Sequence, residues 1–288
     1  MYNYCKYRQF KLSRQGKRRW ILYCLICVVP FSFVSSMENN GRGTKAIGMA
    51  NAFVAVSDNS WAIDYNPAGI AQLKNMECSV FISPNQFGLS ELKTVACAIG
   101  MPLSFGAIAL KGERFGFDLY NETEIGTAIS LDLNQCISLG IAGSLNCLTI
   151  ARYGSTQYLT IDVGMLSRIH RRVQLGFCMS NITKASIGRM KDRTPQQCNF
   201  GVSWRCTESL FLSMELEKDI RYPASIKWGL EQTIFDVLKI HGGIANNPNK
   251  YSTGVAVQYA SIEFGYAGYS HVDLGWTHQI DVTVGLFK

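Results

Sequence analysis

Histidine, acidic residues and long hydrophobic runs are all scarce in this 288-residue sequence. The four histidines are scattered and lack the spacing of a metal site, and no C-x-x-C pair occurs after residue 36. No G-x-S-x-G motif is present, and Gly41, Gly43 and Gly48 lack the spacing and the preceding apolar strand of a dinucleotide-binding loop. We therefore expect a non-enzymatic protein without a metal or cofactor.

Two further absences concern membranes and nucleic acid. From residue 37 onward no stretch approaches 18 consecutive apolar residues, which excludes a transmembrane helix in the mature chain. The formal net charge of +7 suggests a nucleic-acid partner, but seven basic residues precede the first acidic one, so the remainder is neutral. We expect no nucleic-acid partner. The seven are Lys6, Arg8, Lys11, Arg14, Lys17, Arg18 and Arg19.

The basic block is followed by an apolar run from Trp20 to Val34 and then by Ser35 and Ser36. A basic region, an apolar region and a small-residue exit are typical of a secretory signal peptide. We expect residues 1–36 to be such a peptide and to be cleaved. The alternative is a retained anchor helix, which Pro30 disfavours.

The remainder of the chain alternates apolar and polar residues with a period of two. In the stretch YLTIDVGML, Leu159, Ile161 and Val163 alternate with Thr160 and Asp162. About fourteen segments of this kind, separated by turns, occupy residues 76–288, which indicates an all-β fold of antiparallel strands.

The polar face of these strands discriminates between a soluble sandwich and an outer-membrane barrel. It is rich in Gly, Ser and Ala rather than in Lys and Glu, and such small residues suit the interior of a closed barrel. Aromatic residues such as Tyr222, Trp228 and Trp276 lie near segment ends, as in interfacial girdles. The sequence therefore predicts a transmembrane antiparallel β-barrel of about fourteen strands in the bacterial outer membrane. We expect Glu215 and Glu217 to form a structural charge network with Lys227 inside it.

Residues 37–75 lack this alternation and precede the first strand. Because a barrel of this size is too wide for its own side chains to fill, we expect these residues to form a plug, or hatch, in its lumen. Asp58 and Asn59 are positioned to cap a helix beginning near Trp61, and Asn66-Pro67 predicts a turn before the barrel.

The stretch GTKAIGMANAFVAVSDNSWAIDYNPAGIA resembles the N-terminal signature of the FadL-like outer-membrane barrels, in particular the PorV/PorQ group. Near the other end, KWGLEQ and HVDLGWTHQIDVTVG are similar to that group's last strands. Ala50-Asn51 replaces the glycine pair of the signature, and the chain is short for the group. The matching plug positions are Gly43, Ala46, Gly48, Met49, Ala52, Phe53, Val54, Ala55, Asp58, Asn66, Pro67, Ala68 and Gly69.

The resemblance implies two functions. The first is a subunit of an outer-membrane protein machine, as in type IX secretion, with other outer-membrane or periplasmic proteins of a secretion or assembly complex as partners beside the membrane lipid. The second is passive transport of hydrophobic small molecules such as long-chain fatty acids, with Phe53, Val54 and Trp61 lining a hydrophobic ligand pocket. The sequence analysis favours the first function. A purely structural envelope barrel is the third alternative.

Overall fold

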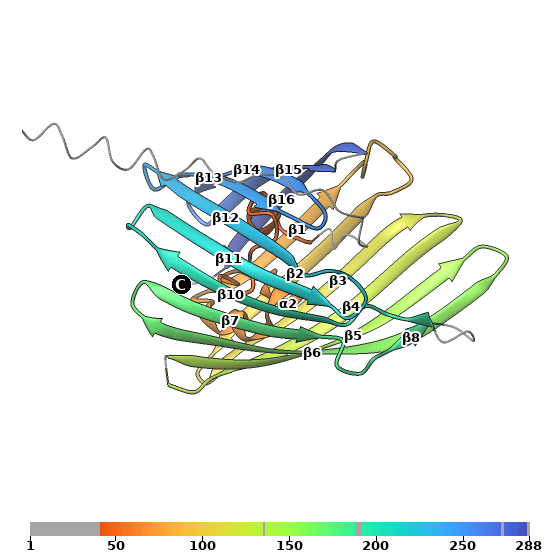
Figure 1. Ribbon diagram of the computed structural model, residues 1–288, viewed down its shortest axis with the longest axis horizontal. Coiled ribbons are helices and arrows are strands. Elements are labelled where there is room, and N and C mark those ends of the chain that lie inside the picture. The colour runs from red at the N-terminus through yellow and green to blue at the C-terminus, as the bar shows by residue number, and fades with distance from the viewer. Residues whose placement is uncertain (1–40, 135, 188–191, 272–273, 287–288) are drawn as a thin grey trace, which may run out of the picture. The chain divides into compact units, whose positions relative to one another are not determined.

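The computed structural model describes residues 41–134, 136–187, 192–271 and 274–286. The predicted signal peptide and residues 37–40 of the predicted plug lie outside the described residues. Within them, fourteen antiparallel strands form a closed barrel (Figure 1). The fold class predicted from the period-two alternation is confirmed.

The barrel strands follow one another around the wall in sequence order, and β1 closes the ring by pairing with β16. Two short strands, β8 (Ser186–Ile187) and β9 (Asp192–Arg193), form a separate hairpin between β7 and β10. The barrel strands are β1 (Met76–Ser83), β2 (Thr94–Leu103), β3 (Gly106–Phe117), β4 (Tyr120–Asp132), β5 (Ile137–Ile150), β6 (Gly154–His170), β7 (Val173–Ser180), β10 (Gln197–Arg205), β11 (Leu210–Asp219), β12 (Ser225–Ile234), β13 (Leu238–Ala245), β14 (Lys250–Tyr259), β15 (Ile262–His271) and β16 (Gly275–Leu286).

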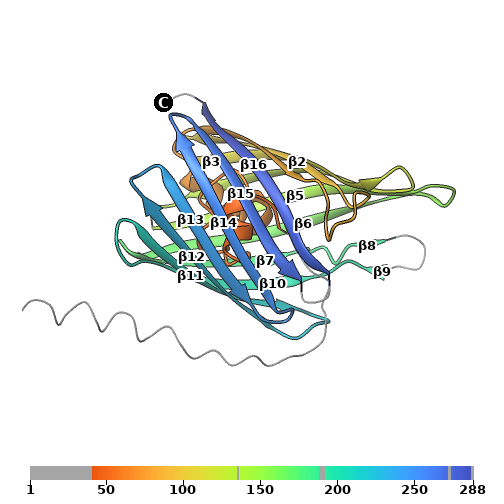
Figure 2. The ribbon, with the colours of Figure 1, turned by 90° about the horizontal axis from the view of Figure 1, so that it is seen from above.

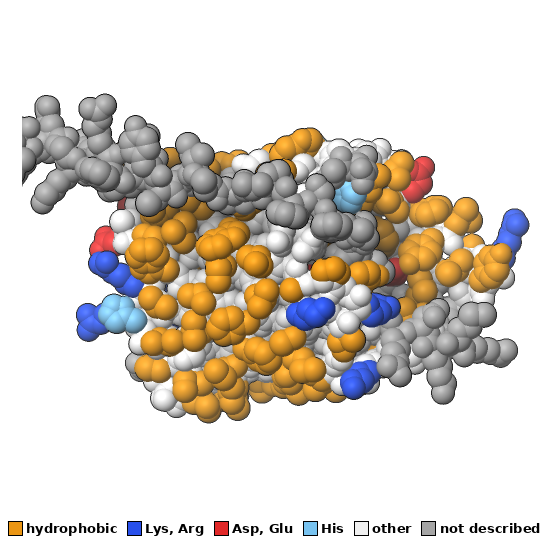
Figure 3. All heavy atoms as spheres, in the orientation of Figure 1, with side chains coloured by type: hydrophobic (Ala, Val, Ile, Leu, Met, Phe, Trp, Pro, Cys, Tyr) orange, Lys and Arg blue, Asp and Glu red, His pale blue; other side chains and the backbone are white. Residues whose placement is uncertain are grey.

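The alternation separates the wall into two faces. Outward-pointing side chains such as Val80, Phe200 and Trp228 are large, apolar and exposed, and Figure 3 shows hydrophobic side chains over much of the face that it draws. Inward-pointing side chains such as Ala98 and Ser130 are small and buried. A closed sheet satisfies its backbone hydrogen bonds internally, so an apolar outer face can meet lipid without exposing an unpaired strand edge.

The two ends of the barrel differ in their connections. The two longest connections, residues 84–93 and 181–196, lie at the end toward which β1 runs, whereas the opposite end has only short turns. Strands β4, β5 and β6 have 13, 14 and 17 residues, more than a tilted bilayer crossing needs, and they project beyond the rest of the wall (Figure 2). Because outer-membrane barrels have short periplasmic turns, we assign the short-turn end to the periplasm.

Three short helical elements precede the wall: α1 (Thr44–Gly48), α2 (Ala62–Tyr65) and η2 (Pro67–Gln72). Figures 1 and 2 show this coil surrounded by the strands. No described helix is long and apolar enough to cross a membrane.

Candidate functional site

Residues 41–73, called here the N-terminal segment, are buried against the inner face of the wall. Ile47, Phe53, Ala62 and Ile70 have exposed fractions of 0%. The segment has little regular secondary structure of its own, and it is buried because the strands enclose it. The candidate functional site is this segment together with the inward side chains that hold it.

Nine inward-facing glycines, called here the glycine belt, lie where the N-terminal segment touches the wall. A Cβ atom added at Gly176 would lie 2.2 Å from the Val54 carbonyl oxygen, and one at Gly140 would lie 2.3 Å from the Ala68 nitrogen. Only glycine permits this approach. The belt consists of Gly100, Gly140, Gly164, Gly176, Gly201, Gly229, Gly243, Gly254 and Gly265.

Apart from Ser60, which approaches Gly100 on β2, the segment meets the belt in the order of its own sequence. Thr44 lies on β15, Gly48 on β14, Met49 on β13 and β12, and Val54 on β10 and β7. Later residues continue the circuit: Asn66 and Pro67 lie on β6, Ala68 on β5 and Leu73 on β2. Three belt pairs are direct cross-strand neighbours, Gly140 with Gly164, Gly176 with Gly201, and Gly229 with Gly243. The N-terminal segment therefore runs around the inner wall, except that Ser60 contacts β1 and β2 between the residues that meet β7 and β6.

Between the glycines, carboxylates of the wall accept hydrogen bonds from the segment's backbone. Glu215 on β11 accepts from the Phe53 and Val54 nitrogens at 2.9 and 2.8 Å. Asp281 on β16 accepts from the Thr44 nitrogen at 2.9 Å, and Glu77 on β1 from the Ser60 nitrogen at 3.0 Å. These bonds satisfy backbone donors that have no strand partner.

The predicted charge network inside the lumen is confirmed. The Lys227 ammonium lies 3.3 Å from a Glu215 carboxylate oxygen and 2.7 Å from a Glu217 oxygen. Because Glu215 is 1% exposed, this pairing compensates a buried charge that also binds the N-terminal segment.

Two basic side chains of the segment are paired with carboxylates. Lys45 lies 2.7 Å from Asp58 and 3.1 Å from Glu231, and Arg42 pairs with Glu113. Burial by itself lowers the pKa of Lys45, but the two carboxylates outweigh it and hold the pKa above its usual value. Lys45 therefore stays charged over the physiological pH range.

The predicted plug residues serve the turns of the segment and its close packing. Gly43 has a φ of 79°, and a Cβ there would meet the Trp61 ring at 2.5 Å, while one at Gly69 would meet Ser57. Gly48 lies against β14, and Asp58 is exposed and paired with Lys45.

Asn66 connects the segment to the wall. Its side chain accepts a hydrogen bond from the Ala68 nitrogen at 3.2 Å and donates to the Val54 and Met165 carbonyls at 2.8 and 3.1 Å. Pro67 is the first residue of η2. The helix expected near Trp61 begins at Ala62, and the Asn59 side chain accepts from the Trp61 nitrogen at 3.1 Å.

Phe53, Val54 and Trp61 do not share one pocket in this structure. Phe53 packs with Met49 and Tyr65, whereas Trp61 packs with Ile47 and Phe81. Val54 lies over Gly201. Their role in binding a ligand stays a prediction, and it requires the segment to rearrange because all three are at most 1% exposed.

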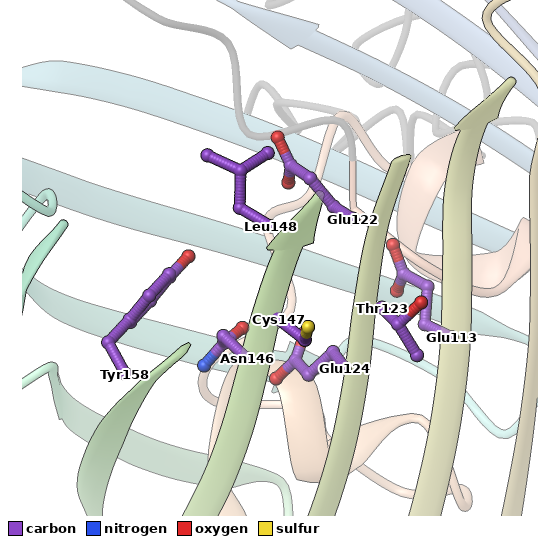
Figure 4. Close-up of a pocket in the computed structure, with 8 residues that line it drawn as sticks. All are labelled: Glu113, Glu122, Thr123, Glu124, Asn146, Cys147, Leu148 and Tyr158. Atoms are coloured by element: carbon purple, nitrogen blue, oxygen red, sulfur yellow. The ribbon is translucent and has the colours of Figure 1, made fainter. Parts of the chain in front are cut away.

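Cavities lie at both ends of the barrel. The cavity in Figure 4 is small, about 30 Å³, and Glu113, Glu122 and Glu124 project into it from β3 and β4. At the short-turn end, a cavity of about 690 Å³ is lined by polar residues that include Lys45, Glu77 and Glu263.

The small inward residues predict a closed barrel, but they do not reveal the belt. Gly201 and Gly229, for example, lie against Val54 and Met49. The signal in the sequence that could have indicated this contact is the presence of glycine at inward-facing positions of many strands.

The fold matches solved outer-membrane channels, although no protein-family model and no curated protein sequence matches the chain. The CymD monoaromatic hydrocarbon channel superposes with a TM-score of 0.69 at 10% identity, covering 88% of this chain and 100% of that one. The Pseudomonas putida toluene transporter TodX gives 0.65 at 9% identity, covering 87% and 100%. A Pseudomonas aeruginosa FadL homologue gives 0.63 at 10% identity, covering 85% and 98%.

These comparisons overturn the prediction that the chain is a subunit of a secretion machine. These solved structures are FadL-type channels and transporters, and they give no support to the PorV/PorQ grouping or to secretion partners. The physical reason is that the motif residues from Gly43 to Gly69 provide turns and close packing against the wall. Such residues are needed by a segment packed inside a barrel whatever the barrel does. The apolar outer wall and these comparisons identify the chain as a bacterial outer-membrane β-barrel with the FadL-type fold.

Proposed function

We propose that this protein is a non-enzymatic channel for hydrophobic small molecules, in which the N-terminal segment plugs the lumen and must rearrange for a ligand to pass. The solved structures with this fold bear the names of hydrocarbon channels and toluene transporters, and none of those reported above is named as an enzyme. In this proposal residues 1–36 export the chain, residues 37–75 form the plug and residues 76–288 form the channel wall. The PorV/PorQ resemblance rests on the sequence motif alone.

The observation that carries this proposal is the contact of the segment with the whole circumference. Besides the nine belt strands, it bonds to β11 through Glu215, to β16 through Asp281 and to β1 through Glu77. Lys111 on β3 binds Asp64, and η2 packs on β4. A molecule crossing the lumen therefore has to displace part of the segment.

The Ser60–Ser79 contact offers a way to lock the segment. The two hydroxyl oxygens are 2.7 Å apart, and both side chains are buried at the junction of the segment with β1. The double variant S60C/S79C, in a background without native cysteines, places two thiols where an oxidant can join them.

We expect the oxidised double variant to stop uptake of radiolabelled toluene by whole cells whose outer membrane lacks another hydrocarbon channel, and a reductant to restore it. The single variants S60C and S79C are the matched controls and should transport under both conditions. Uptake that persists through a complete cross-link would refute a moving plug. Absence of uptake by the reduced protein, tested also with a long-chain fatty acid, would refute the channel itself.

A further inference from the structure

A second cavity at the short-turn end, of about 300 Å³, is markedly basic. It lies where β6 turns into β7 and where β10 ends, and Figure 3 shows basic and histidine side chains together at the left end of the face. Gln72, Gln174 and Ser203 are among its other lining residues. Its basic lining residues are Arg168, His170, Arg171, Arg172 and Arg205, called here the arginine cluster.

The charge of this cavity is not balanced by its own lining. Its described lining residues include no carboxylate, whereas the cavity in Figure 4 is lined by three glutamates and the 690 Å³ cavity by Asp58, Glu77 and Glu263. The four guanidinium groups of this lining produce a positive potential that attracts anions. The cavity therefore favours an anionic ligand.

Backbone contacts hold the cluster together. The Arg205 nitrogen donates to the Arg172 carbonyl at 2.8 Å, which fastens the end of β10 to the turn between β6 and β7. The Arg172 nitrogen donates to His170 Nδ1 at 3.3 Å within that turn. On the inner side, the Gln174 amide donates to the Ala55 carbonyl at 3.0 Å, so the N-terminal segment closes the cavity from within. The guanidiniums thus extend from a fixed frame.

The cluster also lies at the level where the apolar wall ends. Ile169, between Arg168 and His170, is 64% exposed, and Trp204, beside Arg205, is 51% exposed. Exposed apolar and aromatic side chains at a strand end mark the boundary of the bilayer, where lipid phosphates are found. Arginine matches phosphate oxygens with two parallel N–H donors.

We propose that the arginine cluster binds a phosphate group, supplied by the headgroup of an anionic membrane lipid or by a soluble phosphate. Gln72 of the N-terminal segment also lines this cavity, but the phosphate site does not depend on the channel function. Each basic group near a lipid surface contributes about 1 kcal/mol, equivalent to roughly fivefold in affinity. Removing two should therefore weaken binding by about tenfold or more.

The test compares R171Q/R205Q with K93Q/R152Q, which removes the same charge from exposed residues at the opposite end of the barrel. Each purified barrel is titrated in a zwitterionic detergent with short-chain phosphatidylglycerol and, separately, with inorganic phosphate. Bound ligand is counted by native mass spectrometry, and circular dichroism checks that the strands are formed.

Saturable phosphatidylglycerol binding that falls at least tenfold in R171Q/R205Q and is unchanged in K93Q/R152Q supports the site and assigns it to lipid. Inorganic phosphate that competes with the lipid at equal phosphate concentration, with the same dependence on the variants, supports the site and assigns it to a soluble ligand. Equal binding by both variants, or no saturable binding by the wild-type barrel, overturns the proposal. If R171Q/R205Q does not fold, the same titrations are made with the single variant R171Q and its control R152Q, and the same results support or overturn the proposal.

Discussion

The barrel wall and the N-terminal segment satisfy their backbone hydrogen bonds in different ways. A wall strand such as β5 pairs residue by residue with β4 on one side and β6 on the other. The segment instead bonds through short turns and through wall side chains such as Glu215 and Asp281. The wall is therefore stabilised by a repeating pattern, whereas the segment depends on individual residues at individual positions.

This difference has consequences for mutation. The wall has fourteen strand pairs, so the loss of one side chain is shared among many contacts. The segment has few contacts of each kind, so the loss of one hydrogen-bond acceptor or the addition of one methyl group should lower its stability directly.

Deleting residues 41–73 should leave a barrel that inserts and conducts. The wall pairs without the segment, whereas the segment fills the centre of the lumen, so its removal opens a polar passage. Single-channel recordings in planar bilayers should change from little or no conductance in the wild type to stable open pores. Unchanged permeability in a folded deletion variant would mean that the wall closes the lumen by itself.

The variant E215Q should destabilise the protein by about 2 kcal/mol, because charged acceptors give the strongest hydrogen bonds to backbone donors. It weakens the bonds to Phe53 and Val54 and removes one charge beside Lys227. Urea unfolding in detergent measures the change. The matched control is E217Q, since Glu217 also pairs with Lys227 but accepts no hydrogen bond from the described residues of the segment. Equal losses in both variants would show that the bonds from Glu215 to Phe53 and Val54 add no stability.

The variant G176A should cost about 1 to 3 kcal/mol through overpacking. An alanine Cβ there would lie 2.2 Å from the Val54 carbonyl oxygen and 2.6 Å from the Ala55 Cα atom, and both are backbone atoms. The control is G143A, where a Cβ meets nothing within 4 Å, and it should stay within about 0.5 kcal/mol of the wild type. If G176A has the same free energy of unfolding as the wild type in this assay, the segment packs less tightly against β7 than the structure indicates.

The variant D58N should have the smallest effect, under about 1 kcal/mol, because Asp58 is 40% exposed and Lys45 keeps Glu231 as a partner. The raised pKa of Lys45 means that its stabilising charge is fully present below the ordinary lysine pKa of about 10.4 and is lost only as the pH rises beyond it. Unfolding of D58N at pH 6 and at pH 9 should therefore give the same small difference. A difference that grows between these two pH values would contradict this assignment.

The wall was predictable from the sequence because its cause is local. Every second residue of a wall strand must face lipid, so the strand β11 can be predicted from local sequence alone. Its alternating apolar residues are Leu210, Leu212, Met214 and Leu216. The ion pairs of Glu215 and Glu217 with Lys227 followed from the same alternation, because β11 and β12 are neighbours in sequence and in the wall. The prediction of a secretion function was wrong because the motif consists of turn-forming and small residues. Such residues indicate close packing and do not identify a partner.

The residue pattern of the chain is enough to predict a membrane barrel of about fourteen strands, preceded by a segment of different character. The belt of nine glycines on separate strands, and its contacts with the segment, are visible only in the folded chain. The physical reason is the range of the interactions. Strand alternation is fixed by adjacent residues, whereas the belt arises from strand registers and barrel closure, which bring together residues as distant as Thr44 and Asp281.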